Sequence, residues 1–541
     1  MLGRLLRTVR HLRPVQVYGR LWHRLYRPRP DLRLAPALRT QTGVWHQSAS
    51  RRPSMAGAFA FEFLNETGWV QTAEDWHDPG RTKLWLYNLH YFDDLNAQSA
   101  TARTAWHRAL ISRWVTENPP GFGNAWEPYP TSIRIVNWIK WALAGNRLEP
   151  EWVQSLAVQT RWLRRRLEWH LLGNHLFANA KALIFAGLFF DGDEAREWLQ
   201  IGLRILHKEI PEQILADGGH FELSPMYHAI ILEDLLDLVN AGGAWPGGLP
   251  DKMVEEWCPV ASNMMRWLEG LSHPDGDVAF FNDAALGIAP THADLKAYAN
   301  RLNVAASISI RNSPVSLFPE SGYVRLERGD AVALLDVARV GAPYLPGHAH
   351  ADTLSFELSL FGNRAIVNSG TSQYGLGTER LRQRGTAAHN TLTVNGHDSS
   401  EVWSGFRVGR RARPFDLRIT DVDETAIVNC SHDGYQRLPG RPVHNREWRL
   451  RSNCLCVIDR VSGTFEQAIA RYHFHPTVEL LPEQALRLPT GECAQWSVDG
   501  GTPRIVHTLW HPEFGASQSN WCLEIEYERP EISFTLRWRQ I

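Results

Sequence analysis

The sequence predicts an α+β protein in two parts, a helical half followed by an antiparallel β-sandwich. Its 541 residues exceed the roughly 150 residues of one ordinary domain. The period of the apolar residues also changes along the chain. They recur every three or four positions from about residue 100 to 305, and at every second position after about 315. The first spacing is typical of a helix face and the second of a strand face, so we assign the domains to residues 1–310 and 311–541.

The helical half is expected to consist of paired helices joined by short turns. Gly, Pro and Asp cluster between the periodic segments, and functional side chains often collect in such polar connections. The predicted helices lie within 103–118, 151–172, 175–190, 194–210, 227–243 and 254–271.

The second half is expected to be a large antiparallel sandwich, because runs of alternating residues are separated by Gly, Asn and Asp turns. The predicted strands lie within 323–338, 353–361, 390–396, 447–459 and 522–538.

The amino-acid composition limits the classes of ligand that the protein is expected to bind. The net charge of −1 gives no reason to expect a nucleic-acid ligand, so an anionic partner would have to meet a local basic patch. The six cysteines include no CxxC pair, which favours a protein without disulfides.

Residues 1–40 form a basic amphipathic segment. It either docks on its own domain or contacts an anionic membrane surface or a partner. No apolar stretch here is long enough for a signal peptide or a membrane span, so the location stays open, with the cytoplasm or the inner membrane face favoured over secretion by a cleaved signal.

The segment GHAHADTLSF places His348, His350 and Asp352 on every second position. In an extended chain these side chains point the same way, which does not make an ordinary core. Imidazoles serve as general bases or metal ligands, and a nearby carboxylate can fix a tautomer or complete a metal shell. We therefore interpret this motif as part of a functional site rather than a solvated edge.

Other polar stretches are further candidates. Residues 380–413 are rich in arginine and include Arg384 and Trp403. Guanidinium groups bind carboxylates and sulfates, and indole rings stack on the apolar face of a sugar. The alternative to a binding site is that this stretch forms an ordinary charged surface of the sandwich. Trp126, in the sequence WEPYP, offers a second stacking platform if it lies in a loop, and an ordinary packing residue if it does not.

Five separated motifs resemble the heparinase II/III-like polysaccharide lyases, including relatives described as alginate or exopolysaccharide lyases. They are GNHLFANAKAL (173–183), GGHFELSPMYH (218–228), GHAHADTLSFEL (347–358), IVNSGTSQYG (366–375) and RGTAAHNTLTVNG (384–396). The resemblance implies an incomplete α/α toroid followed by a β-sandwich, with the active site where the two meet.

The resemblance also implies site residues. His348 matches the catalytic histidine and Tyr227 the proposed acid, while Asn174, with His175 beside it, matches the group that neutralises a uronate carboxylate. Glu222 and His220 would be neighbouring substrate-binding residues.

The chemistry implied by the resemblance requires no cofactor, but some members hold a structural zinc. The matching ligands would be His350, position 368 and His389. Position 368 is Asn368 here, and an amide is a poor substitute for an ionised zinc ligand, so the metal is an open expectation.

The sequence thus predicts a lyase that cleaves an acidic, uronate-containing polysaccharide by β-elimination. Two alternatives stay open: a glycoside hydrolase using two carboxylates from among Asp217, Glu222 and Glu127, and a non-catalytic protein that binds or assembles polysaccharide. An unsaturated product would distinguish the lyase from both.

Overall fold

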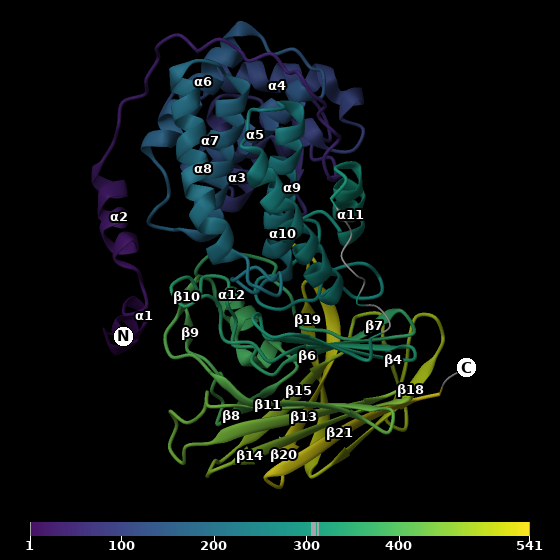
Figure 1. The fold of residues 1–541 in the computed structure, drawn as a ribbon. Helices are drawn as coiled ribbons and strands as arrows, with labels where there is room; N and C mark the ends of the chain where they lie inside the picture. Colours follow the sequence, from purple (N-terminus) through teal and green to yellow (C-terminus); the bar gives the residue numbers. More distant parts are fainter. Residues whose placement is uncertain (1, 305–309, 311–312, 540–541) are drawn as a thin grey trace.

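A computed structural model describes residues 2–304, 310 and 313–539 (Figure 1). A helical half precedes a half made of antiparallel sheets, in the order predicted from the change of period. The predicted boundary at 310/311 adjoins residues 305–309 and 311–312, which lie outside the described residues. The helices are α1 (Leu2–Val9), α2 (Pro14–Leu25), α3 (Lys83–Tyr91), α4 (Thr104–Glu117), α5 (Pro128–Leu143), α6 (Pro150–Arg165), α7 (Gly173–Phe189), α8 (Asp193–Gln213), α9 (Pro225–Ala244), α10 (Asp251–Gly270), α11 (His292–Arg301) and α12 (Thr378–Arg384).

The helical half is built around α7, which is apolar nearly all round and is buried at every position except His175. A helix of this kind is stable only when other helices cover it on all sides. Helices α5, α6, α8 and α9 pack against it, and their apolar side chains join one large core. Among the described residues, no helix is long and apolar enough to cross a bilayer.

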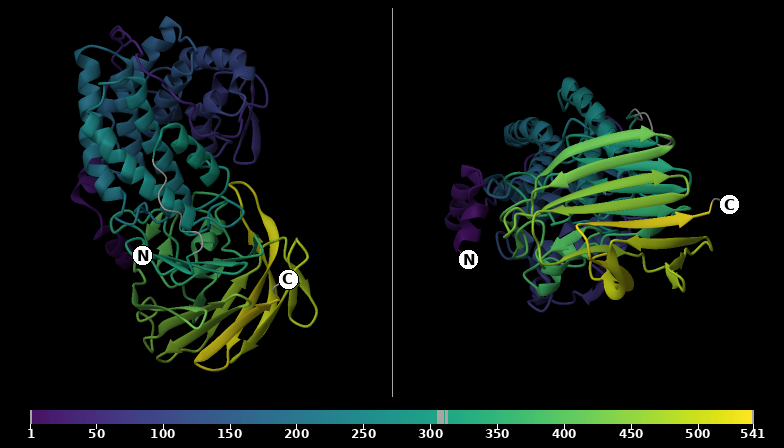
Figure 2. Two further views of the ribbon diagram at one scale, coloured as in Figure 1. Left: turned by 45° about the vertical axis from the view of Figure 1, so that its right-hand side comes forward. Right: turned by 90° about the horizontal axis from the view of Figure 1, so that it is seen from below.

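In the described part of the β half, three antiparallel sheets have five, four and eight strands, and their inward side chains share one core. Figure 2 shows the sheets gathered below the helices. The five-stranded sheet contains β3 (Val315–Phe318), β4 (Tyr323–Arg328), β5 (Ala331–Asp336), β6 (Phe356–Leu360) and β7 (Asn363–Ile366). The four-stranded sheet contains β8 (Leu392–Val394), β15 (Ala468–His473), β19 (Gly501–Trp510) and β20 (Gln518–Tyr527). The eight-stranded sheet contains β11 (Pro414–Val422), β12 (Thr425–His432), β13 (Val443–Arg451), β14 (Cys454–Ser462), β16 (Glu479–Leu481), β17 (Ala485–Arg487), β18 (Cys493–Asp499) and β21 (Glu531–Trp538).

Two short pairs lie outside these sheets. They are β1 (Ala60–Phe63) with β2 (Glu66–Trp69) in the helical half, and β9 (Val402–Trp403) with β10 (Arg407–Val408) near the N-terminal helices. All six cysteines are free.

An apolar cluster joins the two halves at the start of α9. Met226 and Tyr227 pack there with Phe280, and with Val367 and Trp510 from the β half. This contact fixes the first turn of α9 against Val367, which follows β7, and Trp510 at the end of β19. The candidate site is built on this junction.

Buried neutral histidines make the fold sensitive to acid. His228 in the helical half and His473 in the β half are buried, and burial lowers the pKa of each to about 3. Because the unfolded chain binds these protons near pH 6.5, folded stability should fall as the pH drops below that value, by about 2 kcal/mol per histidine at pH 5. We expect the melting temperature to be clearly lower at pH 5 than at pH 7.5, and equal values would contradict the buried neutral state.

Candidate active site

Asp283 is the centre of a buried polar cluster at the junction of the two halves. It accepts hydrogen bonds from His348 Nδ1 and His350 Nε2, each at 2.8 Å, and both Nη atoms of Arg380 donate to it. Burial alone would raise the pKa of this carboxyl, but Arg380 and the two histidines hold it well below its usual range. Asp283 therefore stays ionised and fixes three side chains around itself.

The bond to Asp283 sets the tautomer of His348. With the proton on Nδ1, Nε2 keeps a free lone pair, as a general base requires. Nε2 lies 3.7 Å from Glu222 Oε2, and the His348 side chain is 14% exposed. The backbone N–H of Asp283 also donates to the carbonyl of His348, at 3.0 Å. The ring is thus held in one orientation while one nitrogen stays reachable.

Tyr227 lies directly against His348. Ser224 caps α9 by accepting the N–H of Tyr227, which places this side chain in the first helical turn. The two ring centroids are 4.0 Å apart, and the Tyr227 hydroxyl is hydrogen-bonded to the Tyr374 hydroxyl at 2.8 Å. Burial and the neighbouring Tyr374 raise the pKa of Tyr227 well above its usual value. The convergence of residues 227 and 348 from opposite halves, expected from the sequence, is present.

Glu222 lies next to these two residues and is buried. Burial raises the pKa of this carboxyl, while His348, His175 and the backbone of Asn174 lower it by less. Neither of its oxygens has a well-aligned hydrogen-bond partner among the described residues. Burial without an aligned donor is thus the main cause of the raised pKa of Glu222.

Asn174 and His175 begin α7 on the other side of Glu222. Asn174 is buried, and His175 Nδ1 lies 3.1 Å from Glu168 Oε1. Although burial opposes it, Glu168 raises the pKa of His175. The chain enters the helix through Gly173 at φ 54°, where an added Cβ would lie 2.4 Å from Leu345, so glycine is required there. This backbone geometry places Asn174 and His175 in the first turn of α7, beside Glu222.

The structure corrects two aromatic expectations. Trp126 does not lie in an open loop. It is 3% exposed, and its indole N–H donates to the carbonyl of Asn118. It ends a short 3-10 turn, and α5 begins two residues later at the proline at position 128. Trp403 is half-buried on β9, and its indole N–H donates to the Thr8 hydroxyl. The indole of Trp126 packs against Trp114 and Trp162, and that of Trp403 lies under the guanidinium of Arg407.

Arg384 and His220 are also placed differently from expectation. Arg384 is fully buried and donates to the backbone carbonyls of Ala349 and Ser404, so its guanidinium fixes loops rather than facing a ligand. His220 is fully buried, with Nε2 3.2 Å from Gln213 Oε1. Both side chains support the site from inside the protein.

Four residues were missed as site components by sequence reasoning: Asp283, Tyr374, Arg380 and Phe406. Tyr374 and Phe406 lie around His348, with ring centroids each 5.9 Å from the imidazole, and Phe406 is 43% exposed. Each residue lies within a stretch that the sequence marks as polar or motif-bearing, but nothing in the spacing singles it out. Asp283 lies in the connection between α10 and α11, 65 residues before His348 in the chain.

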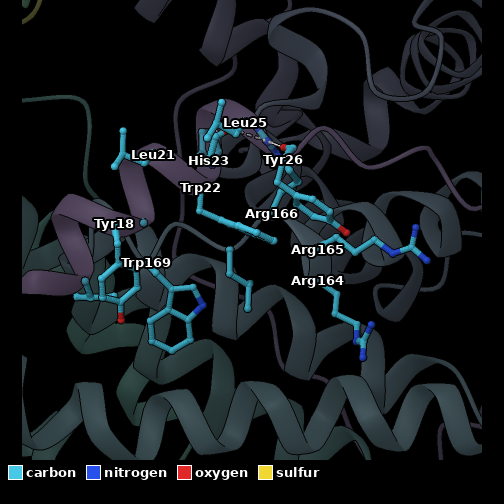
Figure 3. Close-up of a pocket in the computed structure, with 13 residues that line it drawn as sticks. Tyr18, Leu21, Trp22, His23, Leu25, Tyr26, Arg164, Arg165, Arg166 and Trp169 are labelled. Atoms are coloured by element: carbon cyan, nitrogen blue, oxygen red, sulfur yellow. Dashed lines mark hydrogen bonds between the residues drawn. The ribbon is translucent and has the colours of Figure 1, made fainter.

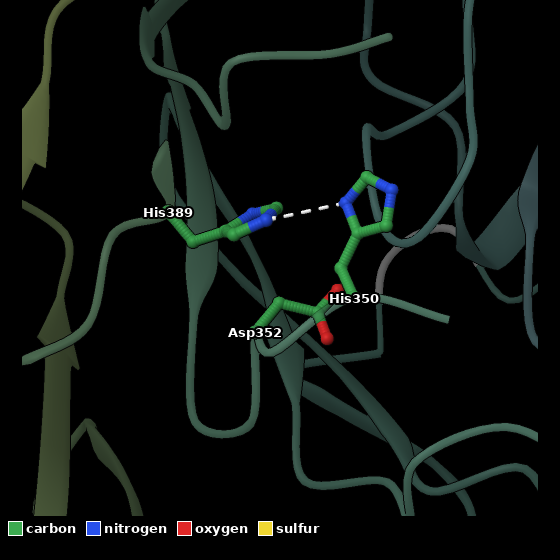
Figure 4. A group of neighbouring side chains, drawn as sticks. All are labelled: His350, Asp352 and His389. Atoms are coloured by element: carbon green, nitrogen blue, oxygen red, sulfur yellow. Dashed lines mark hydrogen bonds between the residues drawn. The ribbon is translucent and has the colours of Figure 1, made fainter. Parts of the chain in front are cut away.

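A second cluster lies behind Asp283. Ligand atoms of His350, Asp352 and His389 lie within 4.8 Å of one another and all three residues are buried (Figure 4). His350 Nδ1 and His389 Nε2 are 3.2 Å apart, close to the spacing of about 3.3 Å between two ligands on a tetrahedral zinc. The side-chain oxygen of Asn368 instead accepts the backbone N–H of Asn390. The donor set of two imidazoles and one carboxylate fits zinc, with Asp352 supplying the carboxylate.

Comparison with known proteins places this geometry in context. The heparin-sulfate lyase of Bacteroides stercoris is 25% identical over 307 residues, which cover 52% of this chain and 45% of that protein. The FtsZ-localized protein C of Caulobacter vibrioides is 25% identical over 375 residues, covering 66% of this chain and 61% of that protein. The chain thus spans about half the length of the heparin-sulfate lyases it matches.

The fold is shared with solved structures. The crystal structure of heparinase III superposes with a TM-score of 0.69 at 18% identity, covering 88% of this chain and 79% of that one. The model of the heparinase II/III N-terminus matches residues 83–304, and the model of the heparinase II/III-like C-terminal domain matches residues 310–538. The chain belongs to the heparinase II/III-like family.

Proposed function

We propose that this protein is a polysaccharide lyase that cleaves a uronate-containing acidic polysaccharide by β-elimination. The observation that carries the proposal is the contact between the rings of Tyr227 and His348, 4.0 Å apart, with His348 Nδ1 bound to an ionised Asp283. A base with a fixed tautomer and a neutral phenol beside it are the two groups that this reaction needs. We further propose that the helical half is an incomplete α/α toroid, and that the domains divide near residue 310.

In the proposed reaction, His348 Nε2 removes the proton from C5 of the uronate. The electron pair of that bond forms the C4–C5 double bond while the bond between C4 and the glycosidic O4 breaks. Tyr227 donates its hydroxyl proton to the departing O4. Its raised pKa keeps the phenol protonated at neutral pH, which suits the role of acid.

The C5 proton is acidic enough only if the charge on the neighbouring carboxylate is neutralised. We assign this task to the amide of Asn174 and the imidazole of His175, whose pKa is raised by Glu168, with the carboxyl of Glu222, whose pKa is raised by burial, beside them. Donors fixed in place before the reaction stabilise the enolate-like intermediate in the same way as an oxyanion hole.

The glycoside hydrolase alternative has less support, because its other two candidate carboxylates already have partners in the protein. Asp217 accepts hydrogen bonds from the backbone N–H and the hydroxyl of Ser321. Glu127 pairs with Lys83 and accepts the Tyr87 hydroxyl. Both carboxylates therefore have partners, whereas the oxygens of Glu222 lack an aligned hydrogen-bond partner among the described residues.

Ultraviolet absorbance of the new double bond tests the proposal. The protein is incubated with heparan sulfate, chondroitin sulfate, alginate, hyaluronan and a bacterial glucuronate exopolysaccharide, and absorbance and reducing ends are followed together. A lyase gives both signals on at least one polymer. Reducing ends without absorbance would indicate a hydrolase, and binding without either signal would indicate a non-catalytic protein.

We assign substrate stacking to Phe406 in place of the tryptophans. Replacing Phe406 by alanine should raise KM by about tenfold with little change in kcat, because the ring is exposed and would contact a bound sugar in both ground and transition state. Steady-state kinetics on the best polymer of the panel checks this, with Phe415→Ala on β11 as the control for loss of an exposed phenylalanine. An unchanged KM would remove Phe406 from the substrate site.

We propose that His350, Asp352 and His389 hold a structural zinc. Bound zinc would join the HxHxD loop to the segment that carries His389, and no catalytic step passes through it. Purified protein should contain about one zinc per chain by elemental analysis, because buried structural sites bind zinc tightly. His389→Ala should lose the metal and lower the melting temperature, whereas His444→Ala, which removes a buried imidazole elsewhere in the β half, should keep the metal. Metal-free wild-type protein after growth with zinc would contradict the assignment.

A further inference from the structure

We propose that the N-terminal helices form a docking surface for a lipid bilayer with anionic headgroups. Residues 1–40 contain ten arginines and a single acidic residue, Asp31. This composition stands out in a chain whose net charge is −1. The segment lies at the side of the molecule, along both halves (Figure 1).

The polar side of α2 is fixed to the protein. Gln16 donates to the carbonyl of Tyr344, and Gly19 lies against His170 so closely that an added Cβ would be 3.3 Å from it. Arg166 donates to the carbonyl of His23 at 2.9 Å. The face defined by residues 16, 19 and 23 is therefore the side that packs inward.

Helix α1 is anchored on the β half. Arg7 makes a bidentate ion pair with Glu401, with Nε and Nη2 each 2.9 Å from a carboxylate oxygen. Thr8 accepts the indole N–H of Trp403. These contacts bind the indole of Trp403 to α1, and they hold α1 in a defined orientation on the β half.

The apolar side of α2 is left facing outward. Tyr18, Leu21, Trp22 and Leu25 are 61%, 59%, 61% and 80% exposed. Their spacing of i, i+3, i+4 and i+7 places them on one face, and at about 100° per residue that face is opposite to residues 16, 19 and 23. A surface helix normally buries its apolar face, so this arrangement is the reverse of the usual one. Leu6 on α1 and Leu34 beyond α2 extend the exposed apolar surface, at 62% and 88%.

A hollow of about 890 Å³ lies between α2 and the end of α6 (Figure 3). Trp22 and Trp169 line it together with the consecutive residues Arg164, Arg165 and Arg166. Two indoles suit the headgroup region of a bilayer. The three arginines hold the hollow together, because Arg164 and Arg165 pair with Glu197 and Asp31 and Arg166 binds the carbonyl of His23.

The positive charge around the apolar face indicates that its binding partner is an anionic bilayer. Exposed arginines accompany the apolar face: Arg20 and Arg24 on α2, Arg4 and Arg10 before it, and Arg27 and Arg29 after it, whereas Arg13 pairs with Glu212 and Arg33 with Asp31. A second copy of this face would bring two arginine-rich surfaces together, which is unfavourable. A peripheral helix with aromatic and leucine residues on one side and arginines around them binds membranes by apolar insertion and by attraction to anionic lipid.

Flotation of the full chain with vesicles tests the proposal. We expect binding to vesicles of phosphatidylcholine with 30% phosphatidylglycerol, little binding to phosphatidylcholine alone, and weakening as salt is raised, because the arginine contribution is screened. Trp22→Ser with Leu25→Ser should lower the partition coefficient by at least about tenfold, and Arg20→Glu with Arg24→Glu by a similar factor.

The matched control is Leu417→Ser with Val422→Ser, which removes exposed apolar residues from β11 and should bind like the wild type. Lyase activity on a soluble polymer should be unchanged in every variant, since none contacts the site. Three results would overturn the proposal: no flotation, equal flotation with neutral vesicles, or unchanged flotation of the Trp22/Leu25 variant. A lipid-free dimer that the same variant abolishes would assign the face to a second copy instead, and would also overturn it.

Discussion

Replacing His348 by alanine is expected to lower kcat by about 10³-fold or more, with little change in KM, because it removes the proposed base and leaves the carboxylate-binding groups in place. The substitution should not unfold the protein. Asp283 keeps its bonds to His350 and Arg380, and the lost side chain is partly exposed. Initial rates of absorbance increase, measured with melting temperatures, check both parts.

Two controls separate chemistry from general damage in this experiment. His397→Ala removes an exposed histidine from the neighbouring arginine-rich stretch and should leave kcat unchanged. His348→Gly with added imidazole should recover part of the lost rate if the missing group is a base. A His348→Ala protein that keeps its activity to within a few-fold would assign proton removal to another residue.

Replacing Asp283 by asparagine should lower activity by about 10²–10⁴-fold and also destabilise the fold. The amide of asparagine has one accepting oxygen and one NH2 donor, so it cannot accept from both His348 and His350, and the tautomer of His348 would no longer be fixed. It would also leave the guanidinium of Arg380 buried without its counter-charge, which typically costs about 3–5 kcal/mol. Asp283 is a positioning residue in this scheme, since it acts through His348.

A second variant distinguishes these two effects of Asp283. Asp283→Asn combined with Arg380→Gln removes the unpaired charge and should recover much of the lost melting temperature, but the rate should stay low because the imidazole is still not oriented. Recovery of activity along with stability would mean that Asp283 serves the fold alone. Rates should be measured well below the melting temperature of each variant, so that unfolding does not contribute to the loss of activity.

The order of the two halves was predictable from the sequence because the spacing of apolar residues is a local property. The period of 3.6 persists through α8, whose buried residues lie on one face, and the period of two persists through the β13–β14 hairpin. Helix α5 was missed because Pro128 and Pro130 resemble a loop, although proline is favoured in the first turn of a helix. This one error also placed Trp126 in a loop.

The site was only partly predictable. His348 and Tyr227 belong to motifs that can be recognised locally, but Asp283 joins them only through the tertiary fold. Arg384 and Arg380 look alike in sequence, yet one binds backbone carbonyls and the other binds Asp283. A difference of one helical turn on α12 decides which arginine faces the site, and composition does not contain that information.

A double substitution examines whether His348 and Tyr227 act together on one sugar ring. Activities of Tyr227→Phe, His348→Ala and the combined variant are compared with the wild type on the same polymer by absorbance of the unsaturated product. If both groups serve one elimination, the combined variant should lose no more than about tenfold beyond the worse single variant. Losses that multiply, or a single variant with wild-type activity, would show that the two side chains do not share a reaction step.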